Sequence, residues 1–301
     1  MKLSKIIFLA MLLGVAVSCF ALHPDAGEYS YQFLNVQGDP AMMALGGRGV
    51  HSLMTEAAFS LQPAIGAVKT HQSVGVSYTA WLDDSSFNQI YYTSSDRFSH
   101  FGVVLRNLDF GKVESRDDTG VFLGYYHPQD VSVMGNYARR ITPSLYAGAN
   151  LGVLYEKLAT ASSIGLHSDL GITYLPPIHN SSLSMTVRNL GLATKVNEQS
   201  SKLPISFEAD LGKHWEFENA SFGLEVAAVK AMDEHLKFSV ANQITVLDIL
   251  YLRGAYKIKQ EPKSLSAGLG IKLRNLNIDY AWTDFSSGLN DVHSFGIKWN
   301  F

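Results

Sequence analysis

Hydrophobic and polar residues alternate with a period of two over most of the chain from Gln72 onward. The clearest run covers residues 264–274, where five apolar residues alternate with Ser, Gly, Lys and Arg. Residues 73–81, 145–155 and 250–259 follow the same pattern. Successive side chains of a β-strand point to opposite faces, so this pattern predicts strands with one apolar face and one polar or small-residue face.

The alternating runs are separated by turn residues such as Asp83-Asp84-Ser85-Ser86 and Pro176-Pro177. A strand of about 9–11 residues, tilted by about 45°, crosses a bilayer core, and the runs have about this length. We count about fourteen runs, an even number as in bacterial single-chain barrels. They start near residues 72, 86, 98, 129, 144, 161, 181, 204, 219, 235, 249, 263, 276 and 291.

The pattern therefore predicts an all-β protein, a transmembrane antiparallel β-barrel of about fourteen strands over residues 72–301. A secreted β-sandwich or propeller also alternates and is the alternative. Aromatic residues near the predicted strand ends favour the membrane barrel, because such barrels carry aromatic girdles at both interfaces. These aromatics are Tyr91, Tyr92, Tyr125, Tyr126, Trp215, Tyr256, Trp282 and Trp299.

Residues 22–71 lack the alternation and mix helix formers with glycine clusters. We expect this segment to form a plug inside the barrel, because about fifty residues can fill a lumen of this size. Within it we expect a tight structural turn at Gly46, Gly47, Arg48 and Gly49, and a second structural position at Pro63. Arg48 is expected to pair with an acidic residue of the wall. Candidates for charged residues facing the lumen are Arg106, Arg139, Arg188, Arg253, Lys257 and Lys272.

Residues 1–21 are typical of an export signal: Lys2 and Lys5 precede an apolar core, and Cys19-Phe20-Ala21 supplies small residues for cleavage. A membrane anchor and lipidation of Cys19 are the alternatives. Cleavage after Ala21 removes the single cysteine and both lysines, which takes the formal charge from −3 to −5. An acidic mature chain argues against a nucleic-acid partner. Export and a barrel together predict the outer membrane of a Gram-negative-type bacterium.

The sequence gives no support for catalysis or for a cofactor. The ten histidines are scattered singly, without a His-Glu-x-x-His pair or a Cys/His metal spacing. A Gly-x-Ser-x-Gly nucleophile turn is missing as well. The carboxylate pairs Asp83-Asp84 and Asp117-Asp118 lie in turn sequences, where solvated aspartates are common. We therefore expect a protein that is not an enzyme and has no catalytic residue, metal site or cofactor.

The chain ends in an alternating run, SFGIKWNF, with Phe295, Ile297, Trp299 and Phe301 separated by Gly, Lys and Asn. In a membrane barrel, Phe295, Ile297 and Trp299 would face lipid while Lys298 and Asn300 face the lumen. We expect this strand to pair with the first, near residues 72–81, since an open edge in lipid leaves backbone groups unsatisfied. Such an ending also resembles the signal that the outer-membrane barrel-assembly machinery reads.

The sequence resembles the PorV/PorQ family of outer-membrane barrels, with a slight lean to PorQ, and this family shares the architecture of FadL-type fatty-acid transporters. The similar segments are YQFLNV, ALGG, NYARRITPSLYAGANLGVLYEKL, VRNLG, KLPISF, LRGAYKI, LSAGLGIKL and NIDYAWTDF, in this order. Gln62-Pro63-Ala64 stands where the family has Asn-Pro-Ala, which puts the hydrogen bond of that asparagine in doubt.

The resemblance implies two functions. One is a non-enzymatic accessory role in type IX-like protein secretion or surface attachment, through loops that dock secreted or surface proteins. The other is FadL-like transport of hydrophobic small molecules past the plug. Both place the protein in contact with outer-membrane lipid. We favour the secretion role, with transport as the alternative.

Overall fold

The computed structural model describes residues 29–49, 55–159, 161–194, 202–258, 263–285 and 290–301. The predicted export signal, including Cys19, lies outside these residues. Among the helices that are described, none is long and apolar enough to cross a membrane.

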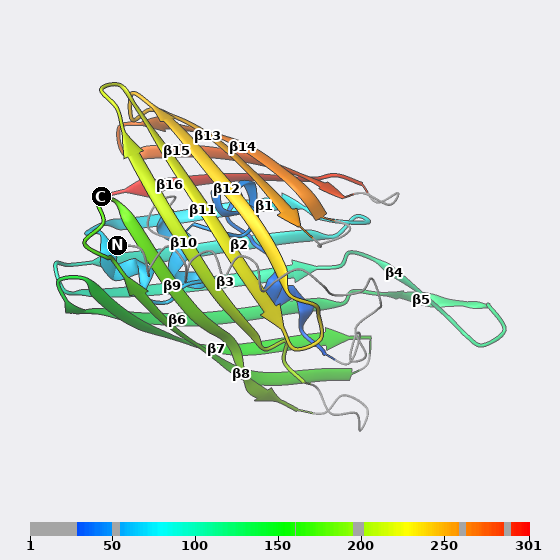
Figure 1. Ribbon diagram of the computed structural model, residues 1–301. Coiled ribbons are helices and arrows are strands. Elements are labelled where there is room, and N and C mark those ends of the chain that lie inside the picture. Colours follow the sequence, from blue (N-terminus) through cyan, green and yellow to red (C-terminus); the bar gives the residue numbers. More distant parts are fainter. Residues whose placement is uncertain (1–28, 50–54, 160, 195–201, 259–262, 286–289) are drawn as a thin grey trace.

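Fourteen strands of the described residues close into one antiparallel barrel (Figure 1). Every strand of the wall pairs with the strands before and after it in the sequence, with β3 next to β6. Each of the fourteen wall strands starts within two residues of a predicted start, so the predicted all-β barrel is confirmed. The strands are β1 (Gln72–Ala80), β2 (Ser86–Ser95), β3 (Ser99–Asp109), β6 (Gln129–Thr142), β7 (Leu145–Leu158), β8 (Ala161–Tyr174), β9 (Ser181–Ala193), β10 (Ser206–Glu216), β11 (Ala220–Ala231), β12 (Lys237–Val246), β13 (Leu250–Ile258), β14 (Lys263–Leu273), β15 (Leu276–Phe285) and β16 (Val292–Asn300).

The first and last strands close the barrel. Val74 lies opposite Trp299 and Tyr78 opposite Phe295, and the Phe301 N–H donates to the Gln72 carbonyl oxygen at 2.9 Å. Closure leaves the described wall of the barrel without an open strand edge. The predicted pairing of the last strand with residues 72–81 is confirmed.

The two faces of the wall follow the alternation of the sequence. On β1, Val74, Val76 and Tyr78 are exposed on the outside, while Ser77 and Thr79 are buried on the inside. Burial alternates in the same way along β2, β3 and β8. The outer surface is therefore apolar, as in barrels that contact lipid.

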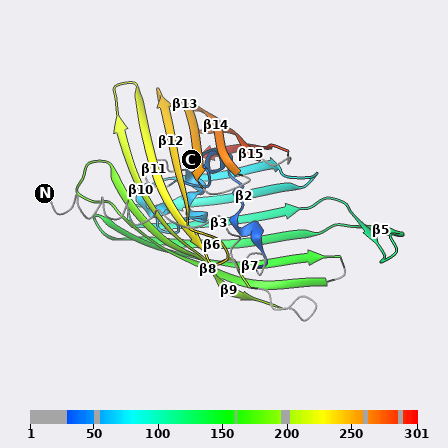
Figure 2. The same cartoon turned by 45° about the vertical axis from the view of Figure 1, so that its right-hand side comes forward.

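Two strands are additional to the predicted ones. β4 (Val113–Arg116) and β5 (Phe122–Tyr126) form a separate two-stranded hairpin that projects beyond the wall (Figures 1 and 2). The Asp117 carboxylate orders the tip, because it accepts from the Thr119 hydroxyl at 2.7 Å and from the Val121 N–H at 2.9 Å. These bonds hold the pKa of Asp117 below its usual value. From the sequence alone, only a loop between Lys112 and Gln129 is predicted here, without strands.

Three of the predicted girdle aromatics lie elsewhere. Tyr125 and Tyr126 belong to the hairpin. Tyr91 is buried on the lumen side, with its ring centroid 6.4 Å from that of Phe59. The reason is strand parity: Tyr92 occupies the outward position, so Tyr91 points inward.

The described residues before β1, 29–49 and 55–71, lie inside the barrel and contain four short helices (Figure 2). They are η1 (Gln32–Asn35), α2 (Pro40–Ala44), η2 (Glu56–Ser60) and η3 (Ile65–Val68). Asp39 caps α2 by accepting from the Met42 N–H at 3.0 Å, and Pro40 occupies its first turn. Gly46 and Gly47, with φ of 67° and 79°, end the helix in a left-handed conformation that favours glycine.

Apolar contacts and small wall residues let this plug fill the lumen. Phe59 packs in a buried cluster with Tyr91, Val104 and Met134 of the wall. A Cβ atom at Gly148 would collide with the backbone of Pro63. The small-residue face of the predicted strands therefore accommodates the plug as well as polar contacts.

Candidate functional site

A cavity of about 630 Å³ remains between the plug and one end of the wall. Its wall residues include Trp81 after β1, Leu108 near the end of β3 and Phe285 at the end of β15. These strand ends lie opposite the end where β1 starts and β16 finishes. The cavity is therefore at the end that carries the β4–β5 hairpin.

Plug and wall both supply apolar lining to the cavity. This lining comprises Tyr31, Phe33, Val36, Met43, Trp81, Leu108, Phe110, Val229, Ala231 and Phe285. Binding sites for small molecules usually have about 300–1,000 Å³ and a mainly apolar lining with a few placed polar groups. The volume of this cavity is in that range, and its lining combines these apolar residues with charged ones such as Arg48 and Glu208.

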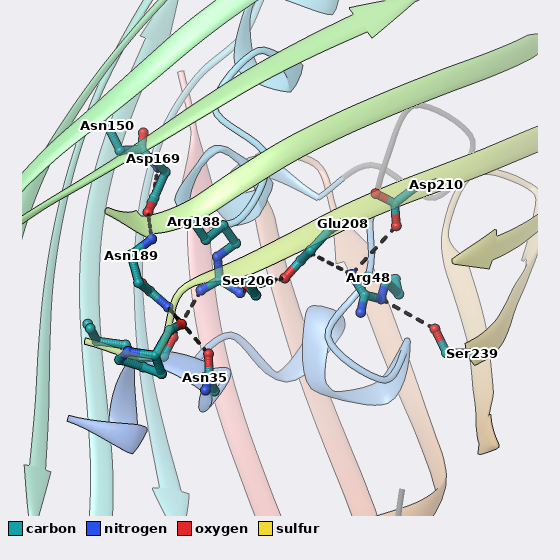
Figure 3. A network of polar contacts seen from close by, with 12 residues as sticks. Asn35, Arg48, Asn150, Asp169, Arg188, Asn189, Ser206, Glu208, Asp210 and Ser239 are labelled. Atoms are coloured by element: carbon teal, nitrogen blue, oxygen red, sulfur yellow. Dashed lines mark hydrogen bonds and ion pairs between the residues drawn. The ribbon is translucent and has the colours of Figure 1, made fainter. Parts of the chain in front are cut away.

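Arg48 forms part of the cavity floor, in the turn after Gly46 and Gly47. Its guanidinium lies 2.8 Å from Glu208 and 3.5 Å from Asp210, both on β10 (Figure 3). Its Nε donates to the Ser239 hydroxyl at 3.3 Å. A tight glycine turn thus presents a plug cation to acidic residues of the wall.

Arg188 of β9 shares the same carboxylate. It lies 3.1 Å from Glu208 and also donates to the Leu34 carbonyl oxygen of the plug at 2.9 Å. Both arginines and Glu208 are largely buried. One carboxylate therefore links the plug to two adjacent strands.

A bulge in β9 lies beside this network. Asn189 has a positive φ of 60°, and the β8–β9 register shifts there. The Asn189 N–H donates to Asp169 at 2.8 Å, and its side-chain amide donates to the Pro204 carbonyl oxygen at 2.9 Å (Figure 3). Bulges bend a strand and re-aim its side chains. The VRNLG segment of the sequence therefore forms a bend, in which both the backbone N–H and the side-chain amide of Asn189 are hydrogen-bonded.

A second ionic cluster joins the plug to the closing strand. Lys298 of β16 lies 2.8 Å from Glu56 of η2 and 3.3 Å from Asp279 of β15. Arg253 of β13 lies 2.6 Å from Asp279. The plug is thus tied by ion pairs to β10 and to β16.

Hydrogen bonds hold the rest of the plug. The Pro63 carbonyl oxygen accepts from Asn136 at 3.1 Å, and the Phe59 carbonyl oxygen accepts from Asn150 at 3.1 Å. Gln62 donates to the Ile172 carbonyl oxygen at 2.9 Å. Gln62 therefore bonds the plug to the wall.

Among the predicted lumen charges, Arg106, Arg188 and Arg253 are buried on the inner face. Lys257 lines the cavity beside Gly46, and Lys272 is half-buried on the inner side of β14. The prediction that Arg139 faces the lumen is wrong, because Arg139 is exposed on the outer face of β6. Its neighbour Ala138 is buried in the lumen, so parity turns Arg139 outward.

Residues of the C-terminal run have the predicted faces. Phe295, Ile297 and Trp299 are exposed outside, and Lys298 is buried inside. Phe301 is exposed at the end of the chain. Whether the assembly machinery reads this strand stays a prediction.

Sequence reasoning missed the acidic partners Glu56, Glu208, Asp210 and Asp279. A signal for the wall residues exists, because Glu208 and Asp210 alternate with Phe207, Ala209 and Leu211. Acidic residues at inward positions of an alternating strand are candidates for pairing with a plug arginine. Nothing in the local sequence says which of them Arg48 reaches.

Neither a protein-family model nor a curated protein matches the sequence. Solved structures do match the fold. The toluene transporter TodX of Pseudomonas putida has a TM-score of 0.60 at 12% identity, covering 88% of this chain and 98% of its own. The monoaromatic hydrocarbon channel CymD has a TM-score of 0.61 at 11% identity, covering 91% and 99%. A FadL homologue of Pseudomonas aeruginosa has a TM-score of 0.55 at 10% identity, covering 88% and 98%. At these identities the likeness establishes a FadL-like fold.

Proposed function

We propose that this protein is an outer-membrane channel for hydrophobic small molecules, which it takes up through the cavity at the hairpin end of the barrel. The observation that carries the proposal is this cavity, to which the plug and the wall both contribute apolar residues. The FadL-like fold supports it, because the similar solved structures named above include a toluene transporter and a monoaromatic hydrocarbon channel. The proposal includes a Gram-negative outer membrane and no enzymatic activity.

Filling the cavity tests this function. Val229 lines the cavity, so Val229→Trp places a large ring where the ligand would bind. We expect uptake of dilute labelled toluene and of a long-chain fatty acid by a complemented deletion strain to fall by about tenfold or more, a barrier increase of about 1.4 kcal/mol.

Leu192→Trp is the matched control. Leu192 is 83% exposed on β9 and does not line the cavity, so uptake should stay at the wild-type level. Equal outer-membrane levels of both variants are required for the comparison. Uptake that is the same in the deletion strain and the wild type would contradict the channel.

The accessory role in type IX-like secretion suggested by the PorV/PorQ resemblance is the second candidate. One observation favours it: the β4–β5 hairpin carries exposed Val121, Phe122, Leu123 and Tyr125. Exposed apolar clusters on a projecting element are typical of protein contact sites. Since the matching structures are transport channels, we place this role behind transport.

A further inference from the structure

Asp130 and Glu156 lie directly opposite each other on β6 and β7. Both line the cavity from the wall. Like charges at directly opposite positions of an antiparallel pair repel each other and destabilise the sheet. Two carboxylates at such positions therefore favour a site that a cation occupies.

Asp130 is buried without a counter-charge. Its side chain is 4% exposed, and its Oδ1 atom is buried with no hydrogen-bond partner. No ion pair to Asp130 or Glu156 occurs in the part of the chain that is described. Arg106, diagonal to Asp130 across β3 and β6, has Arg188 and Asp169 as its charged neighbours. A buried carboxylate without a partner is unusual and points to a missing ligand group.

Other charged residues around the cavity lie close to groups of opposite charge. Arg48 and Arg188 share Glu208, and Arg48 also lies 3.5 Å from Asp210. Lys237 lies 2.6 Å from Glu234. Lys257 is on β13, across the barrel from β6 and β7 in the strand order. The charge excess near Asp130 and Glu156 is therefore negative.

The two carboxylates adjoin an apolar cluster. Leu108 is the cross-strand neighbour of Asp130, and it packs in one buried cluster with Tyr31, Phe33 and Leu154. Tyr31 has a φ of 58°, which is rare for a residue other than glycine, and its hydroxyl donates to Ser163 at 2.6 Å. Strained residues held in this way gather at ligand sites. Aromatic rings also attract organic cations.

We propose that Asp130 and Glu156 bind the ammonium group of an amine whose apolar body lies against Tyr31, Phe33 and Leu108. This inference rests on the proposed channel function and narrows its substrates to organic amines. A metal ion fits less well. The described residues contain no group of three or more His, Cys, Asp or Glu side chains that could hold one, and Ca²⁺ takes 6–8 oxygen ligands.

Three probes of one size test the site on the purified full-length protein: benzylamine, which is a cation at pH 7.5, neutral benzyl alcohol and anionic benzoate. We expect benzylamine to bind about tenfold more tightly than benzyl alcohol, because an ionic hydrogen bond is about twice as strong as a neutral one. Benzoate should bind most weakly. Calorimetry measures all three affinities without any variant.

Asp130→Asn and Glu156→Gln should each bring benzylamine to the affinity of benzyl alcohol. Asp118→Asn removes the same charge from the exposed hairpin tip and should leave all affinities unchanged. Equal affinity for the amine and the alcohol would overturn the inference, as would an amine preference that survives both cavity variants. Asp130→Asn is isosteric and removes an unpartnered charge, so the folded protein should be recovered.

Toluene uptake separates the two proposals. If the protein takes up toluene but shows no preference for benzylamine, the amine proposal is wrong and the channel proposal stands. When the protein speeds the uptake of neither toluene nor benzylamine, the channel itself is wrong.

Discussion

At the scale of single residues, Glu208 is the polar centre of the plug attachment. Arg48 of the plug and Arg188 of the wall both pair with it, at 2.8 and 3.1 Å. Removing one partner of a buried ion pair leaves an uncompensated charge, which costs much more than the pair itself contributes. Glu208 is therefore the shared counter-charge of two buried guanidinium groups.

Glu208→Gln should lower the free energy of unfolding by about 3 kcal/mol or more, since both guanidinium groups lose their shared countercharge. Urea titration of the protein refolded into lipid vesicles measures this change. Glu216→Gln is the control, because Glu216 ends the same strand with a side chain that is 71% exposed. Equal unfolding midpoints for the two variants would show that the Arg48 attachment contributes little.

At the scale of elements, the β4–β5 hairpin is independent of the wall. It pairs only with itself, in a two-stranded sheet that interrupts the path from β3 to β6. β3 and β6 pair directly with each other: Ser99 lies opposite Arg139 at one end of the ladder, and Asp109 lies opposite Gln129 at the other. The barrel therefore does not depend on the hairpin for closure.

Replacing residues 112–127 by a short Gly/Ser turn should leave outer-membrane levels and toluene uptake within about twofold of wild type, because long surface insertions contribute little to stability. Fractionation and the uptake assay measure both. Crosslinking in the native membrane tests the docking role in parallel. Loss of a crosslinked surface protein together with normal uptake would favour docking as a separate function of the hairpin.

At the scale of the whole molecule, closure depends on the last strand. Trp299 lies opposite Val74 on β1 and opposite Leu276 on β15. Lys298, in the same strand, anchors Glu56 of the plug. The C-terminal strand thus joins the wall to itself and to its plug.

Deleting Trp299 to Phe301 should abolish assembly, because it leaves strand ends unpaired in lipid, where each unsatisfied backbone group costs several kcal/mol. Heat-modifiable mobility of the outer-membrane fraction measures folded barrel. Asn300→Ser keeps the strand length and should assemble normally. Normal levels of the truncated protein would mean that the last strand carries no essential assembly signal.

The wall of the barrel could be predicted from the sequence. Period-two alternation depends only on neighbouring residues, so it placed the fourteen strands, their two faces and the pairing of Phe295 and Trp299 with the first strand. It could also place Arg188 and Arg253 on the lumen side. The alternation did not give the correct faces of Arg139 and Tyr91, because a shift of one residue along a strand turns a side chain to the opposite face. The β4–β5 hairpin was not predicted, because its strands are too short to give a periodic pattern of apolar and polar residues.

The contents of the lumen could not be predicted from the sequence, because they depend on contacts between distant residues. Arg48 and Glu208 are separated by 160 residues, and Lys298 and Glu56 by 242, so no local pattern joins them. The cavity and the pair Asp130 and Glu156 arise where the ends of many strands meet the plug. Alternation fixes which face a side chain takes, whereas barrel closure and the fold of the plug fix its partners. For that reason the strands can be predicted from the sequence, whereas the cavity and its lining follow from the three-dimensional fold.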